Sequence, residues 1–193
     1  MQALVVGASR VGKTSFVAST SLATLFPNVV ETSSINEAFE HVERSHLLVA
    51  VYNGTNDKSL WALITHWRSL LLARNAFFAP NARPALVFVA THADLIVNMA
   101  RELSATIEHD ATEMARVYTA DLHLVVNASA GHANMRAFEI VRRHFRTNRR
   151  RYARLTKAIA DEACRRRRVH SAVAVHTEYA ERTSFDVWPN DDE

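Results

Sequence analysis

The chain has 193 residues, of which 48% are hydrophobic and 22% charged, and its formal net charge is +3 at neutral pH. This composition is typical of a folded domain with a sizeable core, and it excludes the disordered and fibrous classes. No apolar stretch approaches the roughly 20 residues that span a bilayer, and an apolar strand at the N-terminus leaves no room for a signal peptide. The single cysteine, Cys164, excludes an internal disulfide and favours a cytosolic or nuclear protein.

Apolar, β-branched runs alternate along the chain with longer segments of helical periodicity. This alternation predicts an α/β fold with a mostly parallel sheet. The expected strands are Ala3–Val6, Asn28–Glu31, His46–Tyr52, Ala85–Ala90 and Leu122–Val126, and the expected helices are 13–26, 34–45, 58–76, 94–118 and a segment from 132 onward. In the helix 58–76 an apolar stripe should face the sheet, and its members are Leu60, Leu63, Ile64, Trp67, Leu70 and Leu71.

The first expected strand leads directly into a phosphate-binding motif. Residues 7–14 read G-A-S-R-V-G-K-T and fit the pattern G-x-x-x-x-G-K-[ST], between a strand and a helix as the motif requires. In such a loop the backbone N–H groups surround a phosphate, the lysine reaches the β- and γ-phosphates, and the final hydroxyl holds Mg²⁺. The predicted phosphate-binding residues are Gly7, Ser9, Arg10, Val11, Gly12, Lys13, Thr14 and Ser15, with Thr14 as the Mg²⁺ ligand.

Two later segments are candidates for recognising a guanine base. The tetrad 91–94 (Thr-His-Ala-Asp) follows the strand Ala85–Ala90, where an Asp carboxylate can accept hydrogen bonds from guanine N1–H and N2–H₂. Thr followed by Asp three residues later is also a helix-capping box, so both interpretations are open. The segment 127–131 lies where a backbone N–H can meet guanine O6. The predicted guanine-binding residues are Thr91, His92, Asp94, Ser129 and Ala130.

These three segments resemble the first, fourth and fifth motifs of small GTPases of the Ras superfamily, and His92 in place of the usual lysine resembles the Roc branch. The resemblance spans residues 1–147. It implies a three-layer P-loop NTPase domain of the small G-protein type, which would bind GTP or GDP with Mg²⁺. Residues 148–193 would then form a basic helical extension and tail.

The chain departs from the GTPase pattern in its switch regions. The D-x-x-G motif is missing, because the first Asp of the chain is Asp57, and the only glutamine is Gln2. The stretch between Thr14 and His46 is too short for two switches and two strands, so we expect a domain that has lost the switch and second-to-third strand region. An on/off cycle would then lack its moving part. Glu31 is a distant candidate for a substitute Mg²⁺ ligand.

A G domain shortened in this same region resembles the centromere protein M family, subunits of the inner kinetochore. The shared features include Val51-Tyr52-Asn53 followed by Lys58-Ser59-Leu60, and the layout of residues 1–147. The resemblance implies a non-cycling scaffold subunit of a nuclear assembly, without catalytic residues and with guanine nucleotide as a structural ligand. Lys13 and Thr14 are a departure, since that family lacks a usable phosphate-binding loop. The main alternative is an active Ras- or Roc-like GTPase, which would be cytoplasmic; a third is a P-loop phosphotransferase.

The positive charge is concentrated in the C-terminal quarter, where residues 142–193 hold 13 Lys and Arg against 8 Asp and Glu. A heptad-like apolar seam runs through the same region and includes one polar member, Asn148. Three interpretations are open for the arginines: a solvated helix face, a helix that binds a protein partner in a hetero-oligomeric complex, and, less favoured, a contact with nucleic acid or anionic membrane. The predicted partner seam is Phe138, Val141, Phe145, Tyr152, Leu155 and Ile159.

Overall fold

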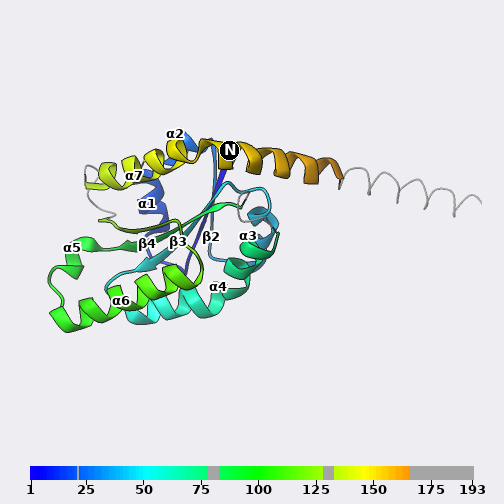
Figure 1. The fold of residues 1–193 in the computed structure, drawn as a ribbon. Coiled ribbons are helices and arrows are strands. Elements are labelled where there is room, and N and C mark those ends of the chain that lie inside the picture. The colour runs from blue at the N-terminus through cyan, green and yellow to red at the C-terminus, as the bar shows by residue number, and fades with distance from the viewer. Residues whose placement is uncertain (21, 78–82, 128–132, 166–193) are drawn as a thin grey trace, which may run out of the picture. The chain divides into compact units, whose positions relative to one another are not determined.

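A computed structural model describes residues 1–20, 22–77, 83–127 and 133–165. Within these residues the strands form one five-stranded sheet in the order β2-β1-β3-β4-β5, and every neighbouring pair is parallel (Figure 1). The strands are β1 (Gln2–Val6), β2 (Asn28–Thr32), β3 (Leu47–Asn53), β4 (Ala85–Thr91) and β5 (Leu122–Val125). The predicted α/β class is confirmed, and the sheet is parallel throughout these strands.

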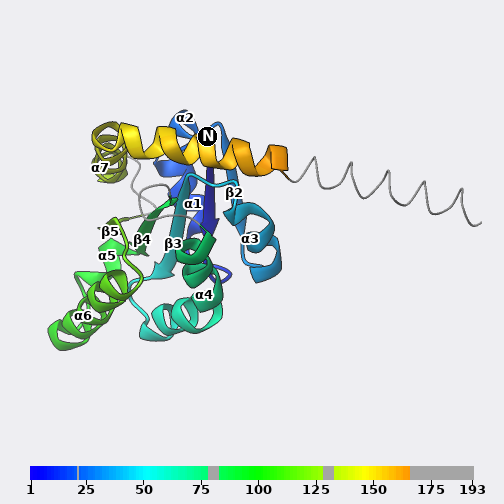
Figure 2. The same cartoon turned by 45° about the vertical axis from the view of Figure 1, so that its right-hand side comes forward.

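Helices cover both faces of the sheet, so the fold has three layers. The helices are α1 (Lys13–Ser19), α2 (Leu22–Leu25), α3 (Ile35–Val42), α4 (Asp57–Phe77), α5 (Ala93–Ile96), α6 (Arg101–Val117) and α7 (Ala133–Thr147). Helices α3, α4 and α6 lie on one face, and α1, α2 and α7 lie on the other (Figures 1 and 2). Two expected helices are divided. The segment 13–26 forms α1 and α2, and 94–118 forms α5 and α6 because Ala100 has an extended ψ of 129°.

The core is built where the apolar stripe of α4 meets the sheet. All six predicted stripe residues are buried, and they pack with alternate residues of β1, β3 and β4, such as Leu4, Leu48 and Phe88. Complete burial of side chains of this size contributes about 1.5–3 kcal/mol each, so this face contributes strongly to the stability of the sheet. The three central strands are almost entirely inaccessible, as expected for strands covered on both faces.

The chain divides into two compact units, Met1–Thr156 and Lys157–Glu193. The first unit continues past the predicted boundary at residue 147. After α7 a turn at Asn148 leads into a second helical segment, residues 149–156, and in the second unit residues 157–165 are helical. Asn148 marks the turn by donating from Nδ2 to the carbonyl of His144 at 3.0 Å.

The predicted partner seam requires correction, because most of it lies inside the first unit. Phe138, Val141, Tyr152 and Leu155 are all buried, with Leu155 completely inaccessible. The remaining seam residue of this unit, Phe145, is half-buried and packs edge-on against Phe26, with ring centroids 5.0 Å apart. A heptad pattern indicates a buried face without specifying what covers it, and here the domain itself covers these residues. The last predicted member, Ile159, belongs to the second unit and is half-buried.

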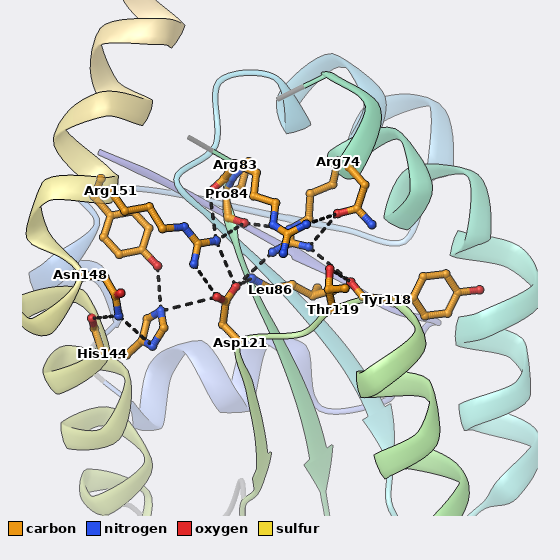
Figure 3. Close-up of polar contacts among 12 residues, drawn as sticks. Arg74, Arg83, Pro84, Leu86, Tyr118, Thr119, Asp121, His144, Asn148 and Arg151 are labelled. Carbon is orange, nitrogen blue, oxygen red and sulfur yellow. Dashed lines mark hydrogen bonds and ion pairs between the residues drawn. The ribbon is translucent and has the colours of Figure 1, made fainter. Parts of the chain in front are cut away.

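At the amino ends of the strands lies a buried ion-pair cluster (Figure 3). Asp121, just before β5, pairs with Arg74 of α4 at 3.0 Å and with Arg151 of the second helical segment, and it accepts a hydrogen bond from the N–H of Leu86 at 2.9 Å. The Arg74 side chain is completely buried and also donates from Nε to the carbonyl of Pro84 at 2.8 Å. Burial lowers the pKa of Arg74 to about 10, so this guanidinium stays charged at neutral pH.

Residues 149–156 therefore cross the amino ends of the sheet and contact three strand starts. Arg151 reaches Asp121 before β5 and donates to the carbonyl of Arg83, before β4, at 3.2 Å. Thr156 Oγ1 lies 3.1 Å from Nε2 of His46, just before β3. The helical segment thus closes the end of the sheet opposite to the phosphate-binding motif.

Candidate phosphate-binding site

The loop between β1 and α1 lies at the point where ligands bind in open parallel sheets. The chain passes from β1 to β2 on one side and then to β3 on the other, which makes the carboxyl end of β1 a topological switch point. The loop turns at three residues with positive φ, Gly7 (153°), Arg10 (63°) and Gly12 (88°). A Cβ on Gly7 would lie 2.3 Å from the carbonyl oxygen of Val51, so only glycine fits there. Left-handed residues among right-handed ones are the backbone pattern of an anion-binding nest.

Lys13 is held over this loop by its own hydrogen bonds. Its Nζ donates to the carbonyls of Gly7 at 3.0 Å and Ala8 at 2.8 Å, and to Oγ of Ser33 at 2.7 Å. Burial lowers the pKa of Lys13, and the nearby charge of Glu31 opposes that shift. An ammonium has three donors, so all of them are used. A phosphate entering the loop would take the place of Ser33, whose side chain is exposed.

Thr14 lies beside a carboxylate that sequence reasoning left out of the site. Its Oγ1 donates to Oε2 of Glu31 at 2.9 Å. Glu31 is near the carboxyl end of β2, and β2 pairs directly with β1, so the strand order brings the acid to the motif. The sequence predicts Glu31 only as a distant candidate ligand, whereas in the structure it contacts Thr14, the predicted Mg²⁺ ligand. The sequence does show an acidic residue near the end of the strand that follows the motif. Predicting that this residue reaches the motif requires knowing that β2 lies beside β1.

The Thr14–Glu31 pair has the chemistry of a magnesium site. Hydroxyl and carboxylate oxygens suit Mg²⁺, which is usually held by one or two protein oxygens, substrate phosphates and water. Among the described residues no group of three or more His, Cys, Asp or Glu converges on one point. Two protein oxygens beside a phosphate-binding loop are a partial ligand set of the kind that Mg²⁺ completes with phosphate and water. The other predicted loop residues, Ser9 and Ser15, are exposed at the same edge.

Thr91 connects the phosphate-binding loop to the neighbouring strands. It is completely buried at the end of β4, where its Oγ1 donates to the carbonyl of Val11 at 2.7 Å and lies 3.1 Å from the carbonyl oxygen of Tyr52. The capping-box interpretation is wrong, because the N-cap of α5 is His92 and no side chain caps this helix. His92 has a φ of 64°, and its Nδ1 lies 2.8 Å from Thr91 Oγ1. Thr91 thus braces the loop, while the carboxylate of Asp94 is exposed in the first turn of α5.

The tetrad 91–94 is joined by a hydrogen bond to the residue that follows β5. The N–H of Ala93 donates to the carbonyl of Val126 at 3.1 Å, which joins the tetrad 91–94 to the end of β5. Ser129 and Ala130 follow this point but lie outside the described residues. The contribution of these two residues to a base site therefore stays a prediction.

Two side chains considered for hydrolysis, Gln2 and Asp57, have hydrogen-bond partners other than Lys13 and Thr14. The only glutamine, Gln2, begins β1 at the opposite end of the strand, and its Nε2 donates to Ser45 Oγ at 3.3 Å. Asp57 lies at the start of α4, where its carboxylate accepts a hydrogen bond from the N–H of Lys58 at 2.7 Å. Neither side chain is tied to Lys13 or Thr14.

Comparison with protein-family models and with curated proteins gives no match to this chain. In the part of the chain that the structure describes, no helix combines the length and the apolar character needed to cross a membrane.

Proposed function

We propose that this chain is a P-loop nucleotide-binding protein of the small-GTPase type that does not cycle, and that it serves as a scaffold subunit. The observation that carries the nucleotide part is the Thr14–Glu31 contact of 2.9 Å beside Lys13. A cation, a hydroxyl and a carboxylate meet at the switch point of a parallel sheet, next to a loop that requires glycine at residue 7. This is the combination that a magnesium-bound phosphate needs.

Each of the chain's own groups has a defined part in binding. The backbone N–H groups of the loop would surround the phosphate oxygens, and Lys13 would exchange its Ser33 hydrogen bond for one to phosphate. Thr14 and Glu31 would hold Mg²⁺, which neutralises the phosphate charge when bound. Thr91 would keep the loop in place through Val11. The exposed carboxylate of Asp94 supports guanine over adenine, since guanine offers it two adjacent donors.

The segment after β2 supports a protein that does not cycle. At the position of a switch, residues 31–34, the chain reads Glu-Thr-Ser-Ser without glycine, and Thr32 and Ser34 are tied to α3. Ser34 is the N-cap of α3 and accepts a hydrogen bond from the N–H of Glu37, while its own N–H donates to Thr32 Oγ1 at 2.9 Å. A segment fastened to a helix start in this way has little freedom to order and release with the γ-phosphate.

The scaffold part rests on the resemblance to the centromere protein M family and on the missing D-x-x-G motif of the sequence. We infer a nuclear, hetero-oligomeric assembly of the inner kinetochore type. Imaging of the tagged chain through mitosis tests that location: we expect centromeric foci, and a diffuse cytoplasmic signal would contradict it.

Titration with fluorescent GTP, GDP and ATP, with and without Mg²⁺, tests the nucleotide proposal. We expect Mg²⁺-dependent binding with preference for guanine. Lys13→Ala should weaken it about 10- to 100-fold, as expected for loss of a charge-assisted hydrogen bond. Glu31→Gln should remove most of the Mg²⁺ dependence. Lys58→Ala is the matched control, because Lys58 is an exposed lysine at the start of α4.

A hydrolysis assay on the same protein distinguishes the non-cycling scaffold from an active GTPase. Phosphate release measured over many turnovers should stay at the background of the Lys13→Ala variant. Steady release well above that background would overturn the non-cycling proposal in favour of an active GTPase. No binding of any nucleotide by the unmodified chain would remove the nucleotide proposal altogether.

A further inference from the structure

A groove lies at the elbow between α7 and residues 149–156, at the amino ends of the strands. It has a volume of about 630 Å³ and opens to solvent. Its lining comes from the N-terminus, α2 and both helical segments: Met1, Leu25, Phe26, Arg142, Phe145, Arg146, Arg149, Tyr152, Ala153 and Thr156. The phosphate-binding loop is at the other end of the strands, so the two sites can be occupied at the same time.

The floor of the groove is apolar and rigid. Phe145 stacks on Tyr152 with ring centroids 4.0 Å apart and meets Phe26 edge-on at 5.0 Å. The Tyr152 hydroxyl is held by Nε2 of His144 at 2.9 Å, which fixes the stack. Phe26 and Tyr152 are buried and Phe145 is half-buried, whereas Met1 at the groove's edge is 51% exposed. A floor of this kind accepts an apolar side chain with little rearrangement.

The rim of the groove is rich in arginines, and only some of them form ion pairs with acidic residues of the described part of the chain. From residue 140 to residue 160 the sequence has eight Arg and Lys and no acidic residue. Arg151 is paired with Asp121, and Arg142 is paired with Glu139 at 2.9 Å. Arg146 and Arg149 are exposed at the groove, and within the described ranges neither forms an ion pair. Guanidinium groups beside an apolar hollow favour carboxylates, which they bind with two parallel hydrogen bonds.

We propose that this groove binds an acidic segment of a partner protein, with a bulky apolar side chain on the floor and carboxylates on Arg146 and Arg149. A nucleic acid fits less well, because of the aromatic rings that line the groove Phe26 and Tyr152 are buried and Phe145 is half-buried, so no row of open rings is available for successive bases to stack on. The surface shares Phe145 and Tyr152 with the predicted seam and adds the exposed Arg146 and Arg149 at its rim, while the other seam residues of this unit stay buried in the domain. The proposal is independent of nucleotide binding and goes beyond the scaffold function by naming the surface and the chemistry of its partner.

Fluorescence anisotropy with a designed peptide tests the surface on the full chain. The probe is a short fluorescein-labelled peptide in which a central Leu-Phe pair is flanked by glutamates. One matched peptide replaces the glutamates by glutamines, and another replaces Leu-Phe by Gly-Ser. We expect the acidic apolar peptide to bind at least about 10-fold more tightly than either matched peptide, and its binding to weaken as salt is raised.

Two variants locate the binding on the protein. Arg146→Glu with Arg149→Glu should weaken the probe about 10-fold or more. The control, Arg143→Glu with Arg154→Glu, makes the same charge change on exposed residues of the same helical segments outside the groove, and it should bind nearly as the unmodified chain does. Ala153→Tyr should weaken the probe by filling the groove, and because Ala153 is exposed the domain should keep its circular dichroism spectrum.

Several outcomes would overturn the proposal. Equal losses in the groove pair and the control pair would show general attraction to a basic surface. Equal affinity for the glutamine peptide would exclude charge recognition, and no binding by the unmodified chain up to about 1 mM, a ΔG near −4 kcal/mol, would exclude the site. Displacement of the probe by a single-stranded oligonucleotide at much lower concentration than by unlabelled peptide would assign the groove to nucleic acid instead.

Discussion

The two ends of the sheet use similar polar residues in different ways. At the carboxyl ends Lys13 bonds to the exposed Ser33, and Thr14 bonds to Glu31, by single hydrogen bonds at the surface that a ligand can replace. At the amino ends the buried Arg74 donates several hydrogen bonds, and the half-buried Asp121 accepts several. The contrast indicates that one end is arranged for exchange and the other for closure. Exposed polar bonds contribute little to stability, whereas a buried charge depends on its partner.

The largest expected effect on the free energy of unfolding comes from breaking the ion-pair cluster at the amino ends of the strands. Asp121→Ala leaves the inaccessible guanidinium of Arg74 without its carboxylate, and removing one partner of a buried pair typically costs about 3–5 kcal/mol. Urea unfolding followed by circular dichroism measures the change. Glu113→Ala, which breaks the exposed pair with Arg116, is the control and should unfold like the unmodified chain. A small effect at Asp121 would mean that water reaches Arg74, and the two ends would then not differ.

The pH dependence of the same cluster follows from the pKa of Asp121. Burial acts to raise this pKa, but hydrogen bonds from Arg151 and the Leu86 N–H, with the charges of Arg151 and Arg74, hold it below its ordinary value of 3.8. The stabilisation is therefore complete above pH 3.8 and is lost as the pH falls through the lower, folded-state pKa. The difference in unfolding free energy between the unmodified chain and Asp121→Ala should shrink in that acidic range.

A smaller effect should come from His46, which the helical segment 149–156 contacts through Thr156. Burial lowers the pKa of His46 from 6.5 to about 4, so the folded chain holds the ring neutral. Its contribution is complete above pH 6.5 and is lost as the pH falls toward 4. Allowing for partial solvent contact, we expect a loss of about 1–2 kcal/mol across this interval. Urea unfolding at pH 7 and pH 4.5 should show less pH dependence in His46→Asn; an identical dependence would contradict the assignment.

The smallest expected effect on stability comes from a substitution at the carboxyl ends of the strands. Thr91→Val keeps the shape of the side chain but removes the hydroxyl that donates to Val11, which should cost about 1 kcal/mol of unfolding free energy. Nucleotide affinity should fall as well, because the loop loses its brace. Thr106→Val is the matched control, since the Thr106 hydroxyl bonds to the carbonyl of Glu102 on the exposed surface of α6. Equal affinity in the two variants would show that Thr91 does not position the loop.

Local patterns in the sequence predicted much of the fold. Apolar periodicity identified the strands and the buried face of α4, because such patterns depend on near neighbours in the chain. The contact between Thr14 and Glu31 depends on β2 lying beside β1, and the Asp121 cluster joins residues far apart in sequence. Neither follows from spacing alone. The seam shows the same limit, since a heptad pattern revealed that Phe138 and Leu155 are buried but not that their own domain buries them.

The crossing of the strand starts by residues 149–156 also sets the order in which the domain can be completed during synthesis. Every strand of the sheet precedes this segment in the chain. All five strands can therefore emerge from the ribosome before residues 149–156 are available to cover their amino ends. The ion pair between Asp121 and Arg74 can form before residue 151 is synthesised, whereas the ion pair between Asp121 and Arg151 forms only afterwards. The fold is therefore completed late. Its last contacts, such as that between His46 and Thr156, join residues far apart in the sequence.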